Sequence, residues 1–130
     1  MDIIKLVKEN EKRLLDYRRH FHKYPELTGQ EQETINFIRQ KLDKYHVEYV
    51  EIENGGILVT IDSNKPGKTL LLRADIDALP IEECQFNEGG IKKPCVSLNK
   101  GVAHMCGHDC HAAMLLVALQ LLNENKDKFT

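Results

Sequence analysis

Apolar residues in the first third of the chain recur at helical spacing. One apolar face runs from residue 3 to residue 22 and carries Ile3, Ile4, Val7, Leu14, Leu15 and Phe21. Because the residue before a proline avoids the helical region, this predicted helix ends near Pro25. The run Thr28-Gly29-Gln30-Glu31 fits a capping box, in which Thr28 caps a second helix. The apolar face of that second helix carries Ile35, Ile38, Leu42 and Tyr45.

The middle of the chain changes to strand patterns. Residues 47–52 alternate, the Asn54-Gly55-Gly56 run indicates a turn, and residues 57–61 form a second predicted strand. The continuous apolar run 69–72 is typical of a strand that is covered on both faces. This order of helices and strands predicts an α/β sandwich around a mixed sheet that is unfinished, with apolar edges.

The last third begins with a long segment and ends in a helix. Residues 79–102 contain two prolines and a Gly-Gly pair, and loops of this length inside a domain are usually functional. A third helix is predicted to follow, capped by Asp109 or a residue near it. Its apolar positions are Ala112, Met114, Leu115, Ala118, Leu119 and Leu122, and residues 123–130 are polar, as in a frayed end.

Composition excludes several functional classes. The 130 residues are enough for one domain or part of one, and 42% hydrophobic with 29% charged residues is typical of a globular protein. A net charge of −2 provides no basic field for nucleic acid. We expect no membrane span and no signal peptide, and therefore a cytoplasmic location by default. In such a chain the four cysteines favour thiols or metal ligands over disulfides.

The segment from His104 to His111 places five cysteine and histidine side chains and one carboxylate within eight residues. Cys106 and His108 are two residues apart, so in an extended segment both point to one face and can bind one metal or a close pair. Asp75 and Asp77 directly follow the predicted buried strand, where open α/β sheets place their ligands. We therefore predict that the two segments converge on a metal site. Thiolate and imidazole favour zinc, whereas carboxylates favour harder ions such as manganese.

Other interpretations of these residues stay open. Asp75 can instead pair with Arg73, and Asp77 can open the turn at Pro80. Asp109 can cap the third helix or hold a ligating imidazole. The remaining candidates are less favoured as ligands: His104, Cys110 and His111 because one metal cannot reach all of them, Cys84 and Cys95 as ordinary thiols, and His20 and His22 as surface or packing residues.

Three ordered motifs resemble the M20 family of metallopeptidases, most closely its amidohydrolase branch. They are Arg18-Arg19-His20-Phe21-His22 with Pro25-Glu26-Leu27, then residues 72–80 (LRADIDALP), then residues 101–109 (GVAHMCGHD). The resemblance implies an incomplete three-layer, mixed-sheet catalytic domain of the zinc-exopeptidase type. It assigns Cys106 and His108 as ligands at a two-metal centre, and Asp77 as an acidic residue that orients the metal shell. Cys110 departs from the small residue more usual in the family and adds a thiol beside the site.

The resemblance also implies a function and its limits. Family members hydrolyse amide bonds in N-acyl amino acids or small peptides, using zinc or manganese, with nickel or cobalt as alternatives. Their catalytic glutamate, three further ligands and the lid domain through which they dimerise come later in the sequence than residue 130. We therefore expect residues 1–130 to be the N-terminal part of a catalytic domain, inactive alone. The competing hypotheses are a small metal-binding or redox module that uses Cys106, His108 and Cys110, and a truncation product that aggregates through its sheet edge.

Overall fold

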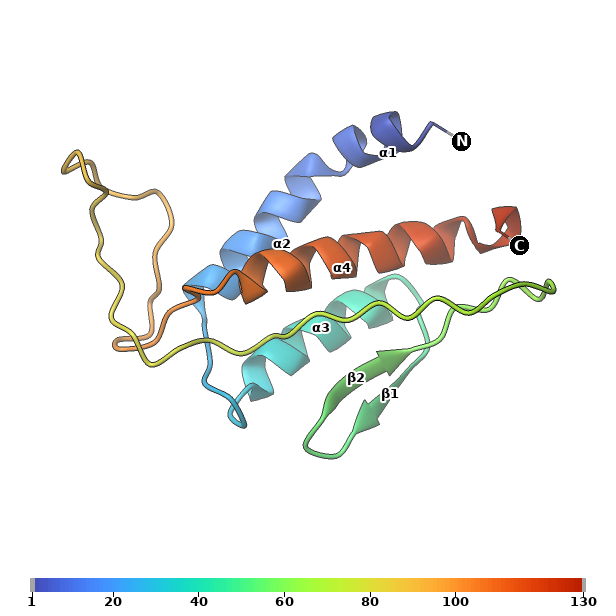
Figure 1. Ribbon diagram of the computed structural model, residues 1–130, viewed down its shortest axis with the longest axis horizontal. Coiled ribbons are helices and arrows are strands. Elements are labelled where there is room, and N and C mark those ends of the chain that lie inside the picture. The colour runs from blue at the N-terminus through green and yellow to red at the C-terminus, as the bar shows by residue number, and fades with distance from the viewer. Residues whose placement is uncertain (1, 130) are drawn as a thin grey trace.

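The computed structural model describes residues 2–129, in which three long helices lie against a small hairpin and a long irregular segment (Figure 1). The helices are α2 (Glu11–Lys23), α3 (Gln32–Lys44) and α4 (His108–Glu124). A short helix α1 (Ile3–Glu9) precedes them, and a 3-10 turn, η1 (Lys126–Lys128), follows α4. The sheet consists of β1 (Tyr49–Ile52) and β2 (Gly56–Val59). The helices α2 and α4 lie side by side, although most of the chain separates them in the sequence (Figure 1).

The first predicted helix is two helices, because the chain breaks at Asn10. The Asn10 side chain donates to the carbonyl oxygen of Leu6 over 2.8 Å, and its backbone N–H turns back to Val7 over 3.1 Å. Asparagine competes in this way with the helical hydrogen bonds of its neighbours. As a result α1 buries none of its residues, and the apolar side chains of Ile3, Ile4 and Val7 remain exposed. The prediction of one continuous face from residue 3 to residue 22 is therefore wrong before Asn10.

The predicted hairpin is confirmed. Strands β1 and β2 pair antiparallel, with Tyr49 opposite Val59 and Ile52 opposite Gly56. The turn between them places Asn54 at φ +56° and Gly56 at φ +105°, in the left-handed region that asparagine and glycine tolerate best. The asparagine and glycine that predicted this turn are therefore the residues that adopt its left-handed backbone conformation.

The core lies where the three long helices and the hairpin meet. Its buried residues are Tyr17, Phe21, Leu42, Val47, Ala112, Ala113, Leu116 and Val117. The ring of Phe37 contacts Tyr17 and Phe21 edge-on, at centroid distances of 5.8 and 5.2 Å, and stacks on His20 at 3.6 Å. The faces predicted for α2 and α3 supply Phe21 and Leu42 to this core. The face predicted for α4 is wrong apart from Ala112, because α4 buries Ala113, Leu116 and Val117 and leaves Met114 51% exposed.

The prediction of a buried strand at residues 69–72 is wrong in this structure. The segment runs extended across the molecule, and Leu70 and Leu71 are 78% and 81% exposed. Within residues 2–129 no strand pairs with it, so its backbone gains no ladder hydrogen bonds and its side chains gain no cover. The predicted α/β class is confirmed, but the sheet of the described residues is only two-stranded.

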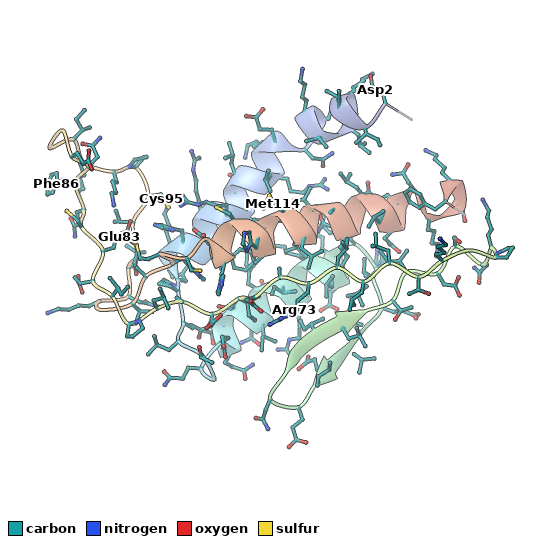
Figure 2. The ribbon with its side chains drawn as sticks, viewed as in Figure 1. Asp2, Arg73, Glu83, Phe86, Cys95 and Met114 are labelled. Atoms are coloured by element: carbon teal, nitrogen blue, oxygen red, sulfur yellow. The ribbon has the colours of Figure 1, made fainter. Side chains whose placement is uncertain are left out.

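Residues 79–102 form the predicted long loop. Its outer tip is closed by an isolated bridge between Phe86 and Lys92, and Phe86 lies far from the helices (Figure 2). Its inner part is bound to the end of α2, where the Leu98 N–H donates to the Lys23 carbonyl and the Asn99 side chain donates to Pro25. This inner part lies beside the start of α4. None of the helices in residues 2–129 has the length and apolar character that crossing a membrane requires.

Candidate functional site

Three short extended segments meet in front of the start of α4. Leu27 pairs in parallel with Ala78, whose N–H donates to the Glu26 carbonyl over 2.7 Å. Leu79 and Ala103 exchange two backbone hydrogen bonds of 3.0 Å each. These pairs fix the backbone on both sides of Asp77 and just ahead of the Cys106–His108 run. The backbone of the site is therefore held by isolated β-bridges, which are too short to give a strand pattern in the sequence.

Asp77 and His108 are in direct contact, as the predicted convergence requires. The Nδ1 atom of His108 lies 2.9 Å from Oδ1 of Asp77 and 3.0 Å from its backbone carbonyl oxygen. Because that carbonyl oxygen can only accept, Nδ1 carries the proton and donates. This arrangement leaves Nε2 of His108 as the nitrogen able to bind a metal.

The other oxygen of Asp77 is held by a residue from a distant part of the chain. Oδ2 accepts a 2.5 Å hydrogen bond from the hydroxyl of Thr28. That hydrogen bond, together with the contact to His108, lowers the pKa of the Asp77 carboxyl and keeps it ionised. Both carboxylate oxygens of Asp77 therefore have a defined partner.

The capping box predicted at Thr28 is wrong. Helix α3 begins at Gln32, and its first free N–H groups, at Glu33 and Thr34, donate to the carboxylate of Glu26. The Thr34 hydroxyl donates to the same carboxylate over 2.8 Å. Glu26 thus takes the role that the sequence pattern assigned to Thr28, and the Thr28 hydroxyl is available for Asp77.

Gly107 directs the chain from Cys106 into α4. Its φ of +97° lies in the left-handed region, and the helix begins at the next residue, His108. The Cys106 side chain precedes this turn and is exposed, whereas the His108 side chain is only 20% exposed. Cys106 therefore presents an accessible thiol next to an imidazole whose tautomer is fixed.

Asp109 lies inside the first turn of α4, so of the two predicted alternatives the cap is a residue near Asp109 and not Asp109 itself. Its side chain is almost fully buried, with Oδ2 2.7 Å from Nδ1 of His22 and 3.1 Å from Nε of Arg18. Gly107 occupies the cap position instead. The Asp109 carboxylate thus has partners on both helices, because Oδ2 faces α2 and Oδ1 accepts the Cys110 N–H over 2.9 Å.

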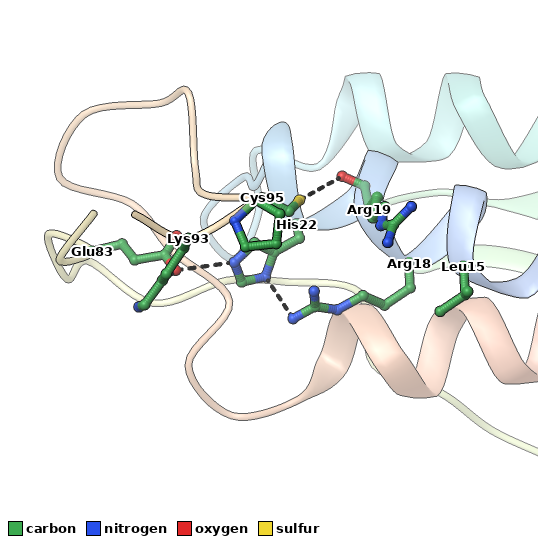
Figure 3. A pocket seen from close by; sticks show the side chains of 8 residues that line it. Leu15, Arg18, Arg19, His22, Glu83, Lys93 and Cys95 are labelled. Carbon is green, nitrogen blue, oxygen red and sulfur yellow. Dashed lines mark hydrogen bonds and ion pairs between the residues drawn. The ribbon is translucent and has the colours of Figure 1, made fainter. Parts of the chain in front are cut away.

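His22 is the centre of this buried network (Figure 3). Its Nε2 atom lies 3.2 Å from Oε1 of Glu83, so each ring nitrogen faces a carboxylate oxygen. Glu83 also contacts Lys93 at 3.3 Å and accepts the Ser97 N–H over 2.7 Å. Of the two predicted alternatives for His22, the surface residue is wrong, because the side chain is buried and joins α2 to α4 and to the long loop.

Paired charges keep both carboxyl groups of this network ionised. Burial alone would raise the pKa of Asp109, but His22, Arg18 and the Cys110 N–H together hold it below its usual value. Burial likewise opposes ionisation of Glu83, and the Ser97 N–H, His22 and Lys93 lower its pKa overall. The network adjoins a cavity of about 430 Å³ lined by Leu15, Arg18, Arg19, His22, Glu83, Lys93, Pro94 and Cys95 (Figure 3).

The less favoured candidates form no cluster of three or more metal-binding side chains within the described residues. Asp75 pairs with Arg73, which is its predicted alternative, and Cys95 is buried with its Sγ atom 3.7 Å from the Arg19 carbonyl oxygen. His104 is buried, neither of its ring nitrogens has a partner among the described residues, and burial lowers its pKa. The His111 ring centroid lies 6.2 Å from that of His108.

The described residues fit a metal ion only as part of a ligand set. No group of three or more His, Cys, Asp or Glu side chains within residues 2–129 is arranged to hold one ion. An exposed thiol and a free imidazole nitrogen are nevertheless donors of the kind that zinc binds. Sequence reasoning missed Thr28, His22 and Glu83, although the first two lie in or beside the motif that surrounds Pro25.

The chain is similar in sequence to known metallopeptidases and deacetylases. The sequence profile of "Peptidase family M20/M25/M40" matches residues 71–130. An N-acetyl-L-cysteine deacetylase of Bacillus subtilis (strain 168) is 44% identical over 118 residues, which cover 90% of this chain and 27% of that protein. The match includes all three motifs, but the chain spans only about a quarter of this relative's length.

Two solved structures share the fold. A protein described as an aminohydrolase, from methicillin resistant Staphylococcus aureus, superposes with a TM-score of 0.86 at 44% identity, covering 98% of this chain and 33% of that one. The Bacillus subtilis YXEP protein, described as a dinuclear metal binding peptidase, gives a TM-score of 0.81 at 36% identity, covering 93% and 33%. Both similarities extend over nearly all the described residues, and the chain spans about a third of each structure.

Proposed function

Because this chain belongs to peptidase family M20, we propose that the complete protein is a metal-dependent amidohydrolase. Its substrates are N-acyl amino acids or small peptides, as the names of the deacetylase and peptidase relatives suggest. The observation that carries the proposal is the contact between Asp77 and His108. It fixes one imidazole nitrogen as a donor and leaves the other free beside an exposed cysteine.

Each of the three residues has a distinct role in this proposal. Cys106 and His108 bind metal, and Asp77 holds the His108 ring in the tautomer and orientation that binding needs. A metal pair bound there supplies Lewis acidity toward the amide carbonyl and activates water at neutral pH. Zinc suits the thiol and imidazole, manganese suits added carboxylates, and nickel or cobalt are alternatives. The dinuclear relative supports divalent metal in general.

The organisation of the complete protein is part of the same proposal. Residues 1–130 form the N-terminal part of the catalytic domain, and the remaining ligands and the catalytic glutamate lie beyond them. A lid domain, also beyond them, closes over the substrate and joins two copies into a homodimer. The protein works in the cytoplasm, without nucleic acid or membrane partners. The 130-residue chain alone is therefore inactive.

Hydrolysis assays test this function directly. We expect the complete protein to release amino acid from N-acetyl-L-cysteine or a related N-acyl amino acid, to lose activity in chelator and to regain it with zinc or manganese. We expect the Cys106→Ser and His108→Ala variants to lose at least about 100-fold in kcat/KM, in line with removal of direct metal contacts. Full activity in both variants, or activity that survives chelation, would refute the proposal.

A second assay separates this function from the small metal-binding or redox module. The amidohydrolase predicts that the 130-residue chain binds zinc weakly and that Cys110→Ser leaves the affinity unchanged. The Cys110 side chain is partly buried within the first turn of α4, after the turn at Gly107. Tight stoichiometric binding that Cys110→Ser abolishes would favour the module instead.

A further inference from the structure

We propose that Thr28 is a positioning residue of the metal centre, which it serves by fixing the carboxylate of Asp77. This inference rests on the proposed function and adds to it a residue that never touches metal or substrate. Thr28 lies in the loop between α2 and α3, 49 positions before Asp77 in the sequence. Its hydroxyl donates to Oδ2 of Asp77 over 2.5 Å.

Each carboxylate oxygen of Asp77 contacts a different residue. Oδ2 receives Thr28 and Oδ1 receives Nδ1 of His108 at 2.9 Å. A carboxylate that is held at one oxygen can rotate little, so the other oxygen stays aimed at the imidazole. The hydrogen bond from Thr28 therefore contributes to the orientation of the His108 ring, although the two residues come from different parts of the fold.

The backbone around Thr28 is built to keep its hydroxyl in place. Leu27 pairs with Ala78, the residue after Asp77, so the two segments run side by side in register. Just before it, Glu26 is tied through its carboxylate to Thr34 in the first turn of α3. Just after it, Gly29 has a φ of +78° and Gln30 closes the loop onto Leu27 with a 2.9 Å hydrogen bond.

Thr28 has no packing role that would explain these contacts. The residue is exposed, and the apolar core is formed by other elements. It does not cap α3, because Glu26 accepts the hydrogen bonds from the first turn of that helix. The hydroxyl of an exposed threonine is thus directed at a partly buried carboxylate beside the proposed ligand, and positioning is the role that its contacts support.

Three variants of the 130-residue chain test the proposal. Thr28→Val removes the hydroxyl and keeps the shape, whereas Thr28→Ser keeps the hydroxyl. Thr60→Val makes the same chemical change at another exposed threonine, just after β2, and serves as the control. The first readout is the zinc affinity measured by titration calorimetry. The second is the tautomer of His108 in metal-free protein, measured from the two-bond proton–nitrogen couplings of the labelled imidazole.

We expect Thr28→Val to weaken zinc binding about 10-fold, at the low end of the effect of changes around a metal ligand. We also expect it to raise the Nε2–H form of His108 above its wild-type population. Thr28→Ser and Thr60→Val should behave as wild type in both measurements, with unchanged melting temperatures. A Thr28→Val variant that matches wild type in both affinity and tautomer would overturn the proposal, and so would a loss that Thr28→Ser does not restore.

The tautomer measurement separates the two proposals. Should His108→Ala and Cys106→Ser leave zinc binding unchanged, the proposed metal function fails. The metal-free spectrum still decides whether Thr28 orients His108 through Asp77. Should those two variants abolish binding while Thr28→Val changes neither readout, the positioning role fails and the metal function stands.

Discussion

Leu42 and Leu71 are the same residue type in two very different regions of the molecule. Leu42 on α3 is fully buried at the meeting of three helices, whereas Leu71 in the extended segment 69–72 is 81% exposed. A helix satisfies its backbone hydrogen bonds internally and needs only side-chain partners, but a strand needs a neighbouring strand as well. The comparison teaches that the apolar face of α3 finds its packing partners within the described residues, whereas the apolar segment 69–72 finds no strand partner among them.

The largest expected effect is a loss of stability when a side chain of the well-packed core is shortened. We expect Leu42→Ala to lower the free energy of unfolding by about 2–5 kcal/mol, because it leaves a cavity in the core. The matched change Leu71→Ala should lower it by less than about 0.5 kcal/mol, as for an exposed side chain. Urea denaturation of both variants measures the difference. Equal losses would show that the extended segment is packed in solution.

A second prediction concerns the buried network that joins the helices to the long loop. His22→Leu leaves the carboxylates of Asp109 and Glu83 buried without their shared partner, and should cost about 3 kcal/mol of unfolding free energy. The exposed pair of Lys12 and Asp16 on the same helix provides the control, and Lys12→Ala should have almost no effect. Urea denaturation is again the measurement, and an equally small effect of His22→Leu would contradict the assigned role.

A third prediction concerns self-association through the exposed apolar segment 69–72. Leu71→Lys should leave unfolding within about 0.5 kcal/mol of wild type, since the side chain is already in solvent. It should reduce self-association, because a charge on an unpaired extended segment opposes edge-to-edge pairing. Sedimentation velocity across a concentration series measures this reduction. Unchanged association would place the contact surface elsewhere on the chain.

The smallest expected effect is a pH dependence from the packed region. Burial and the nearby charge of Lys41 lower the pKa of His20, whose ring stacks on Phe37. The unfolded chain therefore binds a proton at a higher pH than the folded chain, so this stability is present above the usual histidine pKa. It is lost as the pH falls below about 6.5. The variant His20→Gln should show a shallower fall in melting temperature between pH 7.5 and pH 5.5. An unchanged slope would contradict this.

Local patterns predicted those parts of the fold that depend on residue spacing and turn chemistry. The faces of α2 and α3 and the turn at Asn54 follow from spacing and turn chemistry, and the structure confirms them. The helix at α4 was also predicted, but its buried face is centred on Ala113, Leu116 and Val117 and not on the predicted positions. The capping role predicted for Thr28 was wrong, and of the alternatives for α4 the cap is Gly107 and not Asp109, because both side chains have tertiary partners. Thr28 bonds to Asp77, and Asp109 bonds to His22.

In the candidate site too, local patterns predicted some residues, whereas the tertiary contacts could not be predicted. Spacing and residue type identified Cys106 and His108, and the resemblance to family M20 singled out Asp77. That Cys106 and His108 bind metal, and that Asp77 supports them, stays a prediction. The contact between Asp77 and His108 depends on the short bridge between Leu79 and Ala103, for which the sequence has no periodic signal. Residues that support the site through tertiary contacts therefore became visible only in the structure.

The most direct measurement is an anomalous difference map from crystals of the 130-residue chain soaked in zinc and recorded at the zinc absorption edge. The account predicts a peak within bonding distance of both Cys106 Sγ and His108 Nε2, with Nδ1 of His108 still hydrogen-bonded to Asp77. A peak at Cys84 or Cys110 alone, or no peak beside Cys106 and His108, would contradict the assignment of this metal centre.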